Sequence, residues 1–60
     1  MTAAEALLKV EEQILKARQS ALDLAARQPD AIGRLAYESV ASTHKHDAEV
    51  CRIIRESLEK

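Results

Sequence analysis

The stretch Gln28-Pro29-Asp30 divides the chain into two segments of similar length. Proline has no N–H group and its ring clashes with the preceding turn, so it ends or kinks a helix. It also disfavours the helical conformation at the residue before it. Proline is accepted in the first turn of a new helix, and an acidic neighbour suits the positive end of that helix. We therefore predict an antiparallel hairpin with helices over about residues 3–27 and 30–58 and a turn between them.

The composition supports an all-α fold. Ala, Glu, Lys, Leu and Arg make up more than half of the chain, which has one Gly, one Pro and one aromatic residue, Tyr37. This usage is typical of long helices and coiled coils. The alternative to a hairpin is one long helix kinked at Pro29, but that arrangement leaves the apolar stripes of both segments facing water.

The length of the chain limits the stability that a single hairpin can reach without a partner. Sixty residues make a single domain, 1–60. A chain of this length buries only about 60% of the surface that its unfolded form exposes, so it often needs a staple or a partner. Cys51 is the only cysteine, which excludes an intrachain disulfide and a cysteine-rich zinc site. Pairing with a second chain is the remaining means of stabilisation.

The first segment carries a wide apolar stripe. Thr2-Ala3-Ala4-Glu5 fits a capping box, in which the Thr hydroxyl accepts a backbone N–H of the first turn. Three leucines each lie one residue after a position of the main apolar stripe. They make the stripe wider than a two-helix seam, so the helix needs two neighbouring helices, as in a four-helix bundle. The main stripe, with alternating spacings of four and three, consists of Ala3, Leu7, Val10, Ile14, Ala17, Ala21 and Leu24, and the added leucines are Leu8, Leu15 and Leu22.

The second segment repeats the pattern less regularly. Its stripe has alternating spacings of three and four and consists of Tyr37, Val40, His44, Asp47, Cys51, Ile54 and Leu58. We predict that two hairpins form a homodimeric four-helix bundle. The residues expected at the interface are Leu7, Leu8, Val10, Ile14, Leu15, Leu22, Leu24, Val40, Ile54 and Leu58.

A polar belt, residues 42–47, interrupts the second stripe. Either choice of seam through this belt puts Asp47 on the inner face. An unpaired buried carboxylate costs several kcal/mol, so we expect a partner for it, which is His44 three residues earlier, Lys16 or a residue of a second copy. Antiparallel pairing about the turn is expected to set residues 44–47 opposite residues 10–14. The two readings of this belt are a buried polar layer that fixes register or oligomeric state and a solvated surface belt.

Metal and catalytic sites are weakly supported. His44, Asp47 and Cys51 share one face at spacings of three and four, but the order His-x-x-Asp is not the Glu-x-x-His of di-iron bundles. Seven residues of helix separate His44 from Cys51 by about 10 Å, whereas a nucleophile and its base need contact of about 3 Å. No glycine-rich phosphate loop is present. The sequence predicts no metal, no cofactor and no enzyme activity.

Charge and hydropathy bear on location and partners. The net charge is −1 and neither half is a basic arm, which argues against nucleic-acid binding. The first ten residues lack a basic start, and no apolar run approaches the roughly 20 residues of a membrane span. We therefore expect a cytoplasmic protein with a reduced Cys51 and no membrane contact. Arg34 and Tyr37 are candidates for a small contact patch near the turn.

Three functions follow as hypotheses. The first is a small protein-interaction module of the regulator, inhibitor or adaptor and co-chaperone type, acting as a hairpin dimer that binds another protein. The second rests on a resemblance of size and layout to Rop-like dimers, which are RNA-binding helical hairpins, although no sequence motif carries it. The third is a metal- or pH-responsive bundle that uses the His44 and Asp47 layer.

Overall fold

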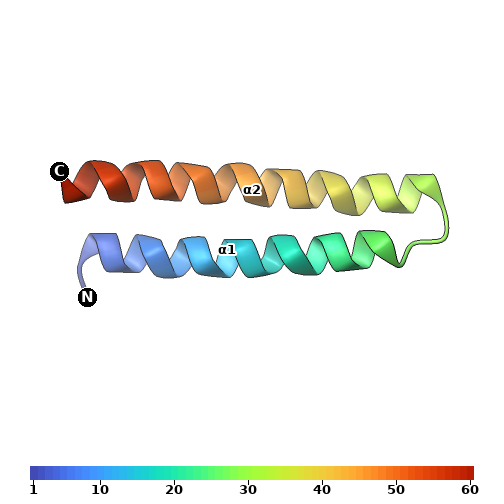
Figure 1. Ribbon diagram of the computed structural model, residues 1–60, viewed down its shortest axis with the longest axis horizontal. Helices are drawn as coiled ribbons and strands as arrows, with labels where there is room; N and C mark the ends of the chain where they lie inside the picture. The colour runs from blue at the N-terminus through green and yellow to red at the C-terminus, as the bar shows by residue number, and fades with distance from the viewer.

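Two helices account for nearly the whole chain, α1 (Ala3–Ala26) and α2 (Ala31–Glu59), in a computed structural model that describes residues 1–60. They lie side by side and run antiparallel, with both termini at one end and the turn at the other (Figure 1). The Cα atoms span 46 × 16 × 9 Å. The predicted all-α hairpin is confirmed, the single kinked helix is wrong, and each predicted boundary at the turn lies within one residue of the observed one. Neither helix has a stretch long and apolar enough to cross a membrane.

The turn is held by side chains that cap both helix ends. Asp30 is the N-cap of α2, and its carboxylate accepts the backbone N–H of Gly33 at 2.6 Å. Pro29 therefore lies just before the cap, in the turn between the two helices. Gln28 donates from Nε2 to the carbonyl of Leu24 at 3.1 Å and satisfies one of the last acceptors of α1. A Cβ on Gly33 would lie 3.1 Å from both Asp30 Oδ1 and Gln28 Oε1, so glycine leaves room for both caps.

Removing the Asp30 cap is expected to destabilise the hairpin. Asp30→Ala leaves the first N–H groups of α2 without a side-chain acceptor and should lower the free energy of unfolding by about 1 kcal/mol. Asp30→Asn keeps an oxygen acceptor and should stay within a few tenths of a kcal/mol of the parent. Urea unfolding followed by circular dichroism measures both, and equal losses for the two variants would contradict the capping role.

The start of α1 confirms the predicted cap. Thr2 is the N-cap, and its hydroxyl accepts the backbone N–H of Glu5 at 3.1 Å. The same hydroxyl donates to the Glu5 carboxylate at 3.3 Å, so the two side chains are joined directly. An acidic residue in the first turn also suits the positive end of the helix.

Small side chains form the contact between the helices. The only fully buried residues are four alanines, Ala21 and Ala25 in α1 and Ala41 and Ala48 in α2. No large side chain is fully buried, so the hairpin alone has a thin core. Half-buried residues continue this seam at spacings of three and four, namely Ala4, Leu7, Glu11, Ile14 and Arg18 in α1 and Tyr37, His44, Cys51 and Arg55 in α2.

The observed seam is rotated from the predicted one in both helices. In each helix every second residue of the observed seam was predicted. The seam residues between them lie one position later in the sequence than predicted, so Ala41 and Ala48 are buried where Val40 and Asp47 were expected. The stripe is wider than one helix contact, and alanines allow a closer approach of two helices than valine or isoleucine does. The displaced residues are exposed, and they are Val10, Ala17, Leu24, Val40, Asp47 and Ile54.

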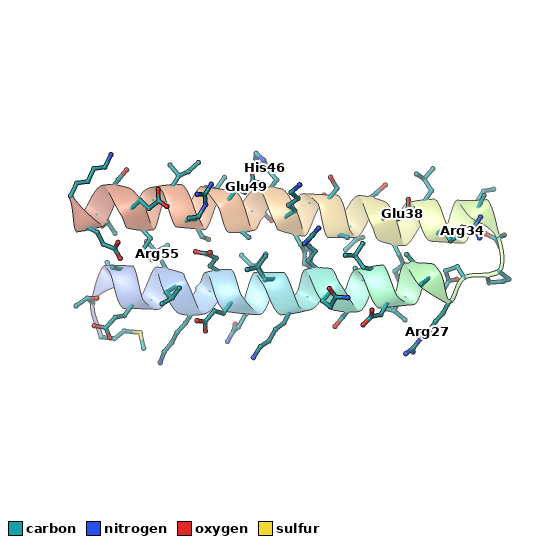
Figure 2. All side chains as sticks on the ribbon, viewed as in Figure 1. Arg27, Arg34, Glu38, His46, Glu49 and Arg55 are labelled. Atoms are coloured by element: carbon teal, nitrogen blue, oxygen red, sulfur yellow. The ribbon has the colours of Figure 1, made fainter.

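One ion pair joins the two helices. Arg55 donates from a guanidinium nitrogen to the Glu11 carboxylate at 3.1 Å, with side chains 20% and 14% exposed. Figure 2 shows Arg55 pointing toward α1. Arg55 also lies 3.8 Å from Glu59 on its own helix. A pair this well covered is screened less by solvent than a surface pair, so it helps to fix the register of the hairpin.

Glu11→Ala is expected to lower the free energy of unfolding by about 1–2 kcal/mol, because it leaves the covered Arg55 guanidinium without its closest acceptor. The matched control is Glu56→Ala, which removes one side of the exposed pair with Arg52 and should cost less than about 0.5 kcal/mol. Both variants gain the same helix propensity. Urea unfolding compares them, and equal effects would show that the cross-helix pair adds nothing.

Candidate functional site: two open faces of the hairpin

The residues that flank the seam fall on two opposite faces of the hairpin. In an α-helix the positions on either side of a seam point in different directions. A shallow hollow brings Leu15 of α1 together with Lys45 and Arg52 of α2, which identifies one face. We call this the leucine face, and its residues are Leu8, Leu15, Leu22, Lys45 and Arg52. The other face, here called the uncharged face, contains Val10, Ala17 and Leu24 from α1 and Val40, Asp47 and Ile54 from α2.

The uncharged face is almost free of ionisable side chains. The chain has nine Lys and Arg and ten Asp and Glu, yet only Arg27 and Asp47 lie on this side of either helix. All other charged residues lie in the seam, on the leucine face or on the outer surfaces. The rest of its outer edge is formed by Ala6, Gln13 and Ser20 from α1 and by Ala36, Thr43, Val50 and Ser57 from α2.

Large apolar side chains on the uncharged face are open to water. Val10 and Val40 are each 46% exposed, Ile54 is 45% exposed and Leu24 is 40% exposed. Leu58, at the end of α2, is 55% exposed. Single exposed apolar residues are ordinary on protein surfaces, but the first four of these lie along one face of two helices, which makes this face a candidate interaction surface.

The predicted polar layer is divided between the seam and the uncharged face. His44 is half-buried toward α1, and its Nδ1 is buried without a hydrogen-bond partner. Asp47 is exposed and forms no hydrogen bond or ion pair, so its predicted position inside the hairpin is wrong. The hollow places Lys45 beside Leu15 and Arg18, so residues 44–47 lie opposite residues 15–18 and not 10–14. The cause is that α2 extends past the end of α1 at the turn (Figure 1).

The other candidate residues are dispersed. No three or more His, Cys, Asp or Glu side chains come together as a group that could hold a metal ion, and Cys51 is a half-buried free thiol. Tyr37 is half-buried in the seam and Arg34 is exposed near the start of α2 (Figure 2). Neither forms an ion pair within the hairpin, and a contact patch at this end stays a prediction.

The leucine face carries more charge. Its hollow has a volume of about 230 Å³ and contains three cations, Arg18, Lys45 and Arg52. Arg52 lies 3.5 Å from Glu56, whereas Arg18 and Lys45 form no ion pair. The carboxylates in the hollow are those of Glu11, which is taken by Arg55, and of Glu49. The residues that line the hollow therefore carry three positive and two negative charges.

The ten residues predicted at the interface are distributed over both faces and the seam. Leu7, Ile14 and Leu22 are half-buried, Leu8 and Leu15 are exposed on the leucine face, and Val10, Leu24, Val40, Ile54 and Leu58 are exposed on or beside the uncharged face. Sequence reasoning missed the alanine seam and the cation cluster. The regular spacing of Ala41 and Ala48 in the sequence could have indicated the seam. No sequence pattern could have indicated the cation cluster, because Arg18 lies far from Lys45 and Arg52 in the sequence.

Comparison with protein families, with curated proteins and with solved structures gives no match for this chain. No relative therefore suggests a ligand or a partner.

Proposed function

We propose that the chain is a non-enzymatic protein-interaction module that pairs with a second copy of itself through the uncharged face and so forms a four-helix bundle. The single observation that carries this proposal is the almost charge-free face contributed by both helices. Depletion of charged residues is a property of the core of protein–protein interfaces, and Asp47, in the middle of this face, is the exception. The bundle then acts by binding a further protein, as a regulator, inhibitor or adaptor.

The large exposed surface area of the hairpin supports the proposal that a partner covers one face. The hairpin exposes 4453 Å², whereas a compact monomer of its mass exposes about 3,900 Å². The excess is of the same order as the roughly 800 Å² that each partner buries in an interface of standard size. Only alanines are fully buried inside the hairpin, so covering Val10, Leu24, Val40 and Ile54 on this face would add large apolar side chains to the core.

A second copy fits the face better than an unlike chain of opposite charge. In a two-fold dimer the same patch meets itself, so any net charge on the patch would be repeated across the interface. The uncharged face avoids that repulsion except at Arg27 and Asp47. A four-helix bundle also gives each helix the second neighbour that its wide stripe requires.

The alternatives have less support. RNA binding needs concentrated cations, but Glu11 and Glu49 lie in the same hollow as Arg18 and Lys45. A metal- or pH-responsive bundle requires His44 and Asp47 to act together, and they point to different parts of the hairpin. A cytoplasmic location stays a prediction from the sequence.

Methyl NMR of the full chain with a paramagnetic probe in the solvent tests which face is covered. The methyl groups of Val10, Val40 and Ile54 should be protected from the probe, while those of Leu15 and Ile53 should be broadened. Ile53 is a matched internal control, because it is adjacent to Ile54 and 56% exposed in the hairpin. Equal broadening of Ile53 and Ile54 at high protein concentration would contradict the proposal.

A further inference from the structure

We propose that the leucine face binds an amphipathic helix of another protein that presents a carboxylate at its centre. The inference rests on the proposed function, because pairing through the uncharged face leaves the leucine face as the open apolar surface of the bundle. It adds the place and the chemistry of the partner.

The spacing of the leucines fits a helical occupant. Leu8, Leu15 and Leu22 are seven residues apart, which is about 10 Å along α1. Leu8 and Leu15 are 39% and 41% exposed, and Leu22 is half-buried. A row of apolar side chains at this interval matches the apolar stripe of a docking helix, because apolar residues recur on one side of such a helix at the same interval.

The charges of the hollow set the chemistry of the occupant. Arg18 is half-buried and Lys45 is exposed, and neither has a carboxylate within ion-pair distance. Of the two carboxylates in the hollow, Glu11 is held by Arg55 at 3.1 Å, and Glu49 forms no ion pair with either cation. An arriving Asp or Glu side chain would find two cations beside Leu15 without displacing an existing cross-helix pair. A charged hydrogen bond of this kind is stronger than a neutral one.

The surroundings of the hollow disfavour a polyanion. Glu49 lies in the hollow and Glu56 pairs with Arg52 at its border. A phosphate backbone would bring many negative charges near these carboxylates, whereas a single carboxylate on an otherwise apolar or basic helix would not. The occupant is therefore a protein segment with one central acidic residue and not a nucleic acid.

Selection from a displayed peptide library tests this inference. The library consists of 18-residue helices with a fixed leucine stripe and with Glu, Lys, Gln or Ala at random elsewhere, and the target is the unmodified full chain. Selected peptides should carry Glu at the central position beside the stripe. Absence of enrichment, or enrichment of Lys or of no residue at that position, would overturn the inference.

Charge reversal then locates the contact. Lys45→Glu should weaken binding of a selected peptide by about tenfold, and exchange of the central Glu for Lys in the peptide should restore much of that loss. The matched control is His46→Glu, because His46 is the next residue and points away from α1 (Figure 2). It should change binding less than about twofold. Equal weakening by both variants would contradict binding at the leucine face.

Two further measurements separate the sources of failure. Mixed-sequence RNA that binds more tightly than every selected peptide at 150 mM salt, and loses affinity with Lys45→Glu, would replace the protein partner with a nucleic acid. Sedimentation of the same preparation reports the dimer independently. A dimer that selects no peptide contradicts only this inference, and a monomer that selects Glu-containing peptides contradicts only the pairing through the uncharged face.

Discussion

Replacing Ile54 with lysine is expected to dissociate the dimer. Ile54 is 45% exposed in the hairpin and lies on the uncharged face, so a cation there is buried without a partner when two copies meet. A two-fold interface contains the substitution twice. At roughly 2–3 kcal/mol for each copy, the dissociation constant should rise by more than about a thousandfold. Sedimentation velocity over a range of concentrations measures this shift.

Ile53→Lys is the matched control for Ile54→Lys. Ile53 is the neighbouring residue, has the same side chain and is more exposed, at 56%. One helical position turns it about 100° away from Ile54 and toward solvent. The control should retain the dimer with less than about a fivefold change in the dissociation constant. Equal dissociation by the two variants would show that general loss of hydrophobicity, and not one face, controls association.

Replacing Asp47 with leucine is expected to stabilise the dimer. Asp47 is the one acidic residue on the uncharged face and has no partner in the hairpin, so the dimer covers two unpaired carboxylates. Their removal should raise the free energy of unfolding by about 1–2 kcal/mol per chain and the melting temperature by about 5–10 °C at fixed protein concentration. In a hairpin that stays monomeric the same exposed position should shift stability by less than about 0.5 kcal/mol.

His46→Leu separates this effect from helix propensity. Leucine is the better helix former at both positions, and His46 lies on the outer side of α2 (Figure 2). The control should raise the melting temperature by no more than a few degrees. An equal rise for both variants would mean that Asp47 is not covered. Circular dichroism at several concentrations measures both melting curves.

The sequence was sufficient for the hairpin, and for clear physical reasons. Pro29 and Asp30 end one helix and start the next by local chemistry, which does not depend on the rest of the fold. Thr2 caps α1 in the same local way. Such signals act over three or four residues and can be recognised in the sequence without knowing which helix faces pack together.

The rotation of each helix about its own axis, which sets the seam, could not be predicted from such local signals. Both helices have apolar residues over a wider arc than one contact covers, so the sequence offers two adjacent seams and no local rule selects between them. The small side chains of Ala41 and Ala48 selected the observed one. The Glu11–Arg55 pair and the position of Lys45 beside Arg18 depend on that choice and on the register at the turn, so they could not be predicted before it was known.

Sedimentation equilibrium of the unmodified full chain tests whether two copies pair through the uncharged face. We expect a species of twice the 6.6 kDa chain mass, which Ile54→Lys returns to the single-chain mass and Ile53→Lys does not. A single-chain mass for the unmodified protein throughout the accessible concentration range would contradict pairing through the uncharged face.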